Sequence, residues 1–201
     1  MIEIYARELG PVQANCYIIK NNGHCLIVDP GGEYPGIEKV IKDDIVDAIL
    51  LTHAHFDHIG GLDALLKKYP VDVYVHPKEV NFLSDARYNV SEAFFAHIVS
   101  NAKAKAIAPG KQTIGTFEVE VMYTPGHSIG SVVYIIDRYL FSGDTLFQGS
   151  IGRTDMVTGS MTEMRQSLDK IKQLKRNYTI YPGHGPDTTL EQELSWNPYL
   201  R

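Results

Sequence analysis

The sequence lacks several features that would assign it at once to a class of protein. Only two of its 201 residues are cysteine, so it is not a disulfide-rich secreted chain. It has no basic run and a formal net charge of −5, which argues against a nucleic-acid partner. No apolar run is long enough for a membrane span or a signal peptide. We therefore expect a cytoplasmic protein that binds neither nucleic acid nor membrane.

The two cysteines also carry a local prediction. Asn22-Gly23 lies between two apolar segments and predicts a tight hairpin turn, which would pair Cys25 with Lys20 rather than with Cys16. We therefore expect no disulfide, in keeping with a reducing compartment. We interpret Cys16 as a small buried hydrophobic residue, with a reactive thiol as the alternative.

Length and patterning predict one domain over residues 1–201, because this length suffices for a full hydrophobic core and no linker or repeat interrupts it. Apolar alternation and short apolar runs predict strands over residues 2–7, 15–20, 25–29, 45–51, 71–75, 117–123, 132–136, 139–142 and 179–181. Helical spacing predicts helices over residues 35–41, 60–69, 91–99, 161–175 and 190–196, with one or two helical turns over residues 78–83. Residues 102–115 are expected to form a loop.

The two halves of the chain echo one another. Each begins with strands, places polar side chains at strand ends, and closes with a helix. This order predicts an α/β (α+β) fold, with two mixed sheets packed face to face and helices outside both. We therefore expect a four-layer αββα sandwich.

The chain is organised around a polar cluster between the strand over residues 45–51 and the helix that follows it. His53 and His55 are two residues apart on extended backbone, so their side chains project the same way. Asp57 and His58 are adjacent and diverge into the turn. These residues form two groups of nitrogen and oxygen donors aimed at neighbouring points, which suits two borderline metal ions such as zinc.

The alternative is that these histidines are ordinary hydrogen-bonded residues near a strand end. That reading places several polar groups together without partners, which is costly. A metal supplies the missing partners.

Three later loops repeat the arrangement. His127, Asp144 and His184 each follow a predicted strand, and each is preceded directly by a glycine that permits tight backbone geometry. One Gly-His pair alone is a weak signal that usually marks a turn. Three such loops together with the first cluster are a strong indication of a metal centre.

These residues together resemble the metallo-β-lactamase superfamily, from residue 29 to the C-terminus. The resemblance implies the four-layer fold and two divalent metal ions, with zinc expected first and iron or manganese as alternatives. It also implies the ligands of the two ions. One ion would be held by His53, His55 and His127, and the second by Asp57, His58 and His184. Asp144 would bridge both ions.

Within that superfamily the chain looks most like the short, single-domain branch of the glyoxalase II group. The motifs that carry this likeness are residues 143–147, 150–155 and 183–186, and Glu193 with residues 197–199. A carboxylate at position 144 distinguishes the chain from true β-lactamases. Full glyoxalase II has a C-terminal helical domain that helps bind glutathione, whereas here only a short tail follows His184.

The function implied is hydrolysis of a small-molecule acyl thioester by attack of a hydroxide that bridges the two metals. Asp57 and Asp144 are the expected catalytic residues, since Asp57 can orient the hydroxide and Asp144 would hold both metals. A second reading is an oxygen-using enzyme, because persulfide dioxygenases share this motif set but resemble mononuclear iron sites. A hydrolase of another ester, lactone or phosphodiester class and a non-catalytic metal-binding protein are further alternatives.

Contacts with the substrate are predicted in two places. Arg153 is a candidate for binding a substrate carboxylate, and the alternative is a surface pair with Asp155. Tyr88 and Asn89 lie in the longest irregular segment, which we expect to cover the substrate cleft, with an ordinary surface loop as the alternative. We interpret His76, at the end of a strand, as a structural residue.

Overall fold

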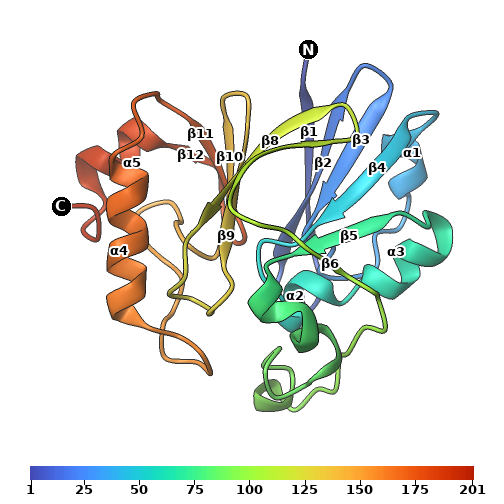
Figure 1. Ribbon diagram of the computed structural model, residues 1–201, viewed down its shortest axis with the longest axis horizontal. Helices are drawn as coiled ribbons and strands as arrows, with labels where there is room; N and C mark the ends of the chain where they lie inside the picture. Colours follow the sequence, from blue (N-terminus) through green and yellow to red (C-terminus); the bar gives the residue numbers. More distant parts are fainter.

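The computed structural model describes residues 1–201 and contains two six-stranded sheets that face one another (Figure 1). The first sheet has, in spatial order, β1 (Glu3–Leu9), β2 (Ala14–Asn21), β3 (His24–Val28), β4 (Ile45–Leu50), β5 (Asp72–Val75) and β6 (Lys105–Ala106). The second has β12 (Thr188–Thr189), β11 (Thr179–Pro182), β10 (Tyr139–Gly143), β9 (Val132–Ile136), β8 (Phe117–Tyr123) and β7 (Gly110–Ile114).

The helices lie on the outer faces of the two sheets (Figure 1). They are α1 (Ile37–Ile41), α2 (Phe56–Ile59), α3 (Leu62–Lys68), α4 (Met161–Lys172) and α5 (Leu190–Trp196), with short 3₁₀ segments η1 (Pro77–Ser84) and η2 (Glu92–Phe94). The first sheet packs on α1 and α3, and the second on α4 and α5. The predicted four-layer αββα sandwich is confirmed.

Alternation along the strands builds the layers. In β9 the side chains of Val132, Tyr134 and Ile136 join the core between the two sheets, while Val133 and Ile135 pack with α4. All five are buried, because the second sheet is covered on both faces. A single strand thus contributes to two adjacent layers of the core.

Strand direction places the loops that matter for function. β3, β4, β5 and β6 run parallel, as do β10 and β11, so each set ends at one edge of its sheet. The polar loops predicted from the sequence follow β4, β8, β10 and β11. Parallel strands bring their carboxyl ends together, and ligand sites form there.

Several local predictions are confirmed. Lys20 pairs with Cys25 across the β2–β3 hairpin, and both cysteines are buried and free. The final helix spans Leu190–Trp196 as expected, whereas α4 stops at Lys172, earlier than the predicted residue 175. None of the helices has the length and apolar character that crossing a bilayer requires.

Other local predictions are wrong. The helix expected over residues 91–99 is only the single turn η2, because Ser91 makes no side-chain cap and Phe95 is fully exposed in a left-handed conformation. The loop expected over residues 102–115 contains β6 and β7, whose short length hides their alternation. By contrast, the helix expected over residues 60–69 is confirmed as α3, which begins two residues later and ends one residue earlier, and the separate short helix α2 precedes it.

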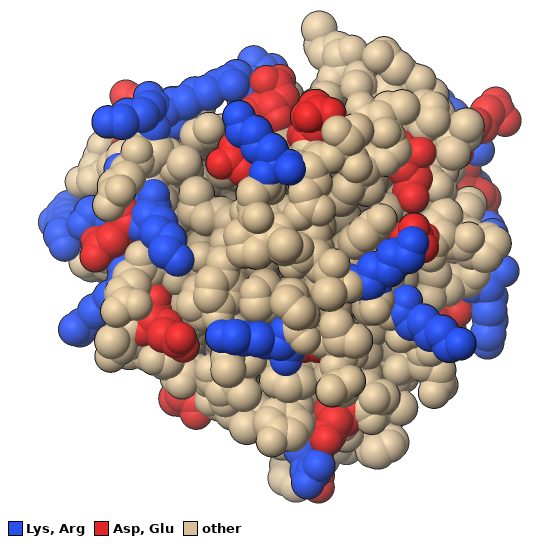
Figure 2. Space-filling view, viewed as in Figure 1, with Lys and Arg blue, Asp and Glu red and all other residues tan.

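Charged residues of both signs are interspersed on the face seen in Figure 2. Ion pairs on the surface of the protein include Lys68 with Glu38 and Lys105 with Asp72, each at 2.7 Å. Exposed pairs of this kind contribute little to stability. This face therefore carries no continuous patch of one charge.

Candidate metal centre

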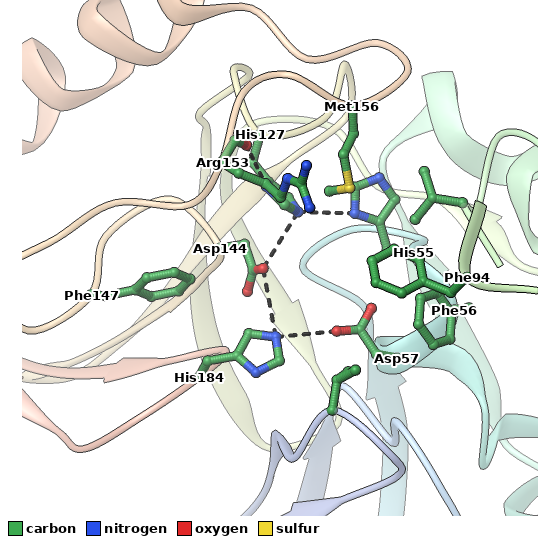
Figure 3. A pocket seen from close by; sticks show the side chains of 12 residues that line it. His55, Phe56, Asp57, Phe94, His127, Asp144, Phe147, Arg153, Met156 and His184 are labelled. Carbon is green, nitrogen blue, oxygen red and sulfur yellow. Dashed lines mark hydrogen bonds and ion pairs between the residues drawn. The ribbon is translucent and has the colours of Figure 1, made fainter.

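The seven predicted ligand side chains converge at one end of the interface between the sheets. His53 and His55 follow β4, and Asp57 and His58 lie in α2. The other three follow strands of the second sheet and are His127, Asp144 and His184. Figure 3 shows five of these side chains, which point toward one another.

The first ligand group consists of His53, His55 and His127. One ring nitrogen from each lies within 4.8 Å of those of the other two. Nδ1 of His55 is 2.9 Å from Nε2 of His127, and all three side chains are buried. Three imidazoles with converging nitrogens form a set suited to a borderline divalent ion.

The second ligand group consists of Asp57, His58 and His184, whose ligand atoms also lie within 4.8 Å of one another. Oδ2 of Asp57 is 3.1 Å from Nε2 of His184 and 3.7 Å from Nε2 of His58. The side chain of His184 keeps 28% of its surface exposed, whereas that of His58 is fully buried. This group is therefore the more open of the two.

Asp144 lies between the two groups. Its Oδ2 is 3.4 Å from Nε2 of His127 in the first group and 3.7 Å from Nε2 of His184 in the second. Its Oδ1 is 3.5 Å from Nε2 of His58. The carboxylate thus faces both groups at once, as a bridging ligand must.

Several buried polar atoms of the cluster have no hydrogen-bond partner. They are His53 Nε2, His55 Nε2, both ring nitrogens of His58 and Asp144 Oδ1. Burying a polar atom without a partner is costly, and such atoms call for an explanation. All of them belong to side chains of the converging ligand groups, so the residues present fit divalent metal ions as the missing partners.

Electrostatics support the same reading. Burial lowers the pKa of His55 to about 3 and also lowers the pKa of His53 and His127, so the first group is neutral and able to bind a metal. Burial raises the pKa of Asp144, but His127 and His58 outweigh it, and on balance its pKa is lowered. Asp144 is therefore an anion between the two groups.

A sequence model of the metallo-β-lactamase superfamily matches residues 9–184. The chain belongs to this superfamily. Its members bind divalent metals, and the ligand cluster here has the corresponding histidines and aspartates. The chain is accordingly a metallo-hydrolase of the metallo-β-lactamase superfamily.

Two curated relatives illustrate the range of the superfamily. "Probable metallo-hydrolase YqgX" of Bacillus subtilis is 42% identical over 96% of this chain and 94% of its own length. A hydroxyacylglutathione hydrolase of Psychromonas ingrahamii is 36% identical over 80% of this chain, but the match covers only 56% of that enzyme.

Two solved structures of the superfamily share the fold over nearly the whole chain. BLEG-1, described as a B3 metallo-beta-lactamase, is 41% identical and has a TM-score of 0.93 over 98% of this chain and 99% of its own. TTHA1623, solved in a di-iron-bound form, is 33% identical with a TM-score of 0.86 over 98% and 100%.

A buried glutamate that the sequence did not reveal supports the first ligand group. The side chain of Glu79, in η1, accepts hydrogen bonds from the backbone N–H of Ala54 at 2.6 Å and of Gly130 at 2.7 Å. It also accepts one from the hydroxyl of Ser128 at 2.5 Å. Ala54 lies between His53 and His55, and Ser128 directly follows His127. One side chain therefore fixes both loops that carry the first group.

Further contacts orient single ligands. Nδ1 of His127 lies 2.8 Å from the carbonyl oxygen of Arg153, which fixes the tautomer and leaves Nε2 free for a metal. Asp29 accepts hydrogen bonds from the N–H and hydroxyl of Thr52, and its Oδ2 lies 3.0 Å from Nδ1 of His58. Asp29 thereby links the residue before His53 to the second group.

Asn15, in β2, holds the loop of His184. Its Nδ2 donates to the carbonyl oxygens of Pro182 at 3.0 Å and Gly185 at 2.8 Å, on either side of the histidine. Its backbone N–H donates to the carbonyl oxygen of Gly183 at 2.7 Å. A Cβ at Gly183 would stand only 2.1 Å from Oδ1 of Asp144, so this glycine is required for the close approach.

A cavity of about 300 Å³ opens beside the ligands. Arg153 lines it, and its guanidinium pairs with Asp155 at 2.7 and 2.8 Å, which is the alternative environment expected for Arg153. Tyr88 and Asn89 do not line the cavity. Tyr88 stacks on Phe82, and Asn89 is fully buried with its side chain bonded within its own loop.

The neighbours of Tyr88 and Asn89 line the cavity instead. Val90, from the same segment, and Phe94, from η2 directly after it, line the cavity, so this region borders the site through different residues from those predicted. His76 stacks on Tyr123 with an interplanar angle of 7° and stands outside the ligand cluster, in line with a structural role.

Proposed function

We propose that this metallo-hydrolase cleaves acyl thioesters. One observation carries the proposal: apart from the ligands, the cavity holds no side chain able to protonate a leaving group. Its other lining residues are apolar, except for Arg153, whose guanidinium does not give up its proton. Alcohol and amine leaving groups benefit from a general acid, whereas a thiolate departs without a strong one.

The residues at the centre have distinct tasks in such a reaction. Divalent ions held there would polarise the substrate carbonyl and lower the pKa of a water molecule. Burial raises the pKa of Asp57, but His58 and His184 outweigh it and lower the pKa on balance. The ionised Asp57 lines the cavity and can accept a hydrogen bond from the attacking water, which orients it. Water adds to the acyl carbon as the carbon–sulfur bond breaks, giving a carboxylic acid and a thiol.

Similarity to a hydroxyacylglutathione hydrolase supports the same class of reaction. The match covers 56% of that enzyme, so its substrate preference is not carried over with the class of reaction. Binding energy from remote parts of a substrate contributes to both rate and selectivity. We therefore expect slow hydrolysis of lactoylglutathione with a high KM.

A second candidate is hydrolysis of β-lactams, favoured by the similarity to BLEG-1, a structure described as a B3 metallo-beta-lactamase. It ranks second because the departing β-lactam nitrogen has no proton donor in the cavity outside the ligand set. The identity of the metal bears on both candidates. Zinc suits the ligand set, and similarity to TTHA1623, solved with two irons, makes iron the first alternative, ahead of manganese.

The test is a panel of assays on protein loaded separately with zinc, iron or manganese, with metal content measured in each sample. We expect thioester hydrolysis, its loss on chelation and its return on adding metal. A chromogenic β-lactam and a persulfide with oxygen-uptake recording complete the panel. Thioester turnover absent from protein that carries two ions per chain would refute the proposal, and turnover of only one of the other substrates would identify the alternative.

A further inference from the structure

The cavity beside the ligands has apolar walls. Beyond the ligands and Arg153, its lining consists of Val12, Phe56, Val90, Phe94, Phe147 and Met156. In Figure 3, Phe147 stands on one side of the ligands, with Phe56 and Phe94 on the opposite side and Met156 above. The rings of Phe56 and Phe94 lie 5.2 Å apart and form one continuous surface. A bound molecule therefore touches apolar side chains on several sides.

Few polar side chains other than the ligands line the same cavity. No serine, threonine, asparagine, glutamine, lysine or tyrosine lines it. The one cation, Arg153, makes a two-pronged ion pair with Asp155, and the pair has no net charge. Glutathione carries two carboxylates, an ammonium and two peptide groups. Inside this cavity these groups would lose water without gaining partners, which is costly.

The volume of the cavity favours a small substrate. The cavity volume of about 300 Å³ is at the small end of the range for ligand pockets. Two of its lining residues, Val12 and Phe94, are also exposed at 38% and 46%, so the apolar surface continues to the rim. A substrate that fills the cavity and reaches this rim still meets apolar side chains.

We propose that the site selects small thioesters whose thiol portion is uncharged and apolar, such as an aryl or short alkyl thiol, over glutathione thioesters. This inference rests on the proposed thioesterase function and specifies its substrate class. Burial of an apolar group supplies the discrimination, since apolar surface removed from water stabilises the bound state in proportion to its area.

The first test compares acetyl thioesters that differ only in the thiol: methanethiol, phenylmethanethiol, N-acetylcysteamine and glutathione. All four are alkyl thiols, and glutathione is the most acidic of them, so leaving-group acidity does not favour the phenylmethanethiol ester. We expect kcat/KM for the phenylmethanethiol ester to exceed that for the glutathione ester by about tenfold or more. A preference for the glutathione ester would overturn the inference.

The second test removes part of the wall. Phe94→Ala should lower kcat/KM for the phenylmethanethiol ester about tenfold and lower that for the methanethiol ester by a smaller factor. Phe95→Ala is the matched control, because Phe95 follows in the same segment but is fully exposed and does not line the cavity. Equal effects of the two variants on the phenylmethanethiol ester would show that the cavity wall does not set the preference.

A binding measurement separates this inference from the proposed reaction. The free thiols, phenylmethanethiol and glutathione, are titrated calorimetrically into metal-loaded protein. Tighter binding of phenylmethanethiol, weakened by Phe94→Ala but not by Phe95→Ala, supports the apolar site even if no thioester is turned over. Glutathione binding as tightly as phenylmethanethiol would overturn the inference even if thioesters are hydrolysed.

Discussion

The two ligand groups of the metal centre are held in different ways. In the first, a single buried side chain, Glu79, ties together the loops that carry all three histidines. In the second, Asp57 and His58 lie in α2, and His184 lies on a separate loop held by Asn15. The first group is buried throughout, whereas His184 is 28% exposed on its side chain.

Because of this difference, the two ligand groups should differ in how tightly they bind a metal ion. A ligand set fixed by one shared support is preorganised, and preorganised ligands bind a metal with less ordering cost. Both groups reach the cavity, the first through His55 and His127 and the second through Asp57 and His184, but the most exposed ligand side chain is that of His184. We therefore expect the first group to bind its ion more tightly and the second to exchange its ion more readily.

The largest expected effect follows from removing the residue that the two groups share. Asp144→Ala should weaken binding at both groups by more than about a hundredfold, since even supporting residues commonly contribute ten- to a hundredfold. Activity should be lost together with the metal. Competition titration against a chromogenic chelator measures both affinities, and loss confined to one group would mean that Asp144 does not bridge.

Asp57→Ala should weaken metal binding at the second ligand group only. Asp57 forms ion pairs with His58 and His184 but with none of the histidines of the first group. Only the metal affinity of the second group should therefore fall, by about a hundredfold. Metal content after dialysis should then approach one ion per chain. Equal loss at both groups in the same titration would show that the ligands are divided wrongly.

Glu79→Gln should weaken metal binding at the first ligand group. The amide replaces one acceptor oxygen with a donor, so at least one of the N–H groups of Ala54 and Gly130 loses its partner. We expect a ten- to hundredfold loss of affinity at the first group and little change at the second. Spectra of cobalt-substituted protein report the geometry of the first group separately from activity.

Glu193→Gln is the matched control for that variant. Glu193 is equally buried and also accepts three hydrogen bonds, from Gly149, Thr188 and Asn197, but it touches neither loop of the first group. Both variants should lower the melting temperature, and only Glu79→Gln should weaken the first ion. If both weaken it equally, Glu79 acts through general stability alone.

The smallest effect is expected for Asn15→Leu, which keeps the branched shape of the side chain but removes its two donated hydrogen bonds. The backbone bond from Asn15 to Gly183 remains, so the loop of His184 loosens without detaching. We expect about a tenfold loss of affinity at the second group alone. Isothermal titration of the second ion, compared with Glu79→Gln, measures this loss, and a weakened first ion would argue against separate supports.

The ligand cluster could be predicted from the sequence because its signal is local. Histidines and aspartates stand directly after recognisable strands, and strands of such a fold end together. The same is true of the fold, since alternation and helical spacing in segments such as β9 and α4 follow from the faces they bury.

The role of Glu79 could not be predicted, because it depends entirely on tertiary contacts. It occurs in a short 3₁₀ segment that resembles surface chain, and its partners lie far along the sequence, at Ala54, Ser128 and Gly130. The helix predicted around Phe94 and Phe95 failed for a related reason. Its aromatic spacing resembles a core-facing stripe, whereas Phe94 instead borders the cavity and Phe95 is exposed.

The most direct test of the shared centre is a crystal structure of zinc-loaded protein with anomalous diffraction recorded at the zinc edge. The account predicts two peaks, one among His53, His55 and His127 and one among Asp57, His58 and His184, with a carboxylate oxygen of Asp144 directed at each. A single peak at full occupancy, with the second group unliganded, would contradict it.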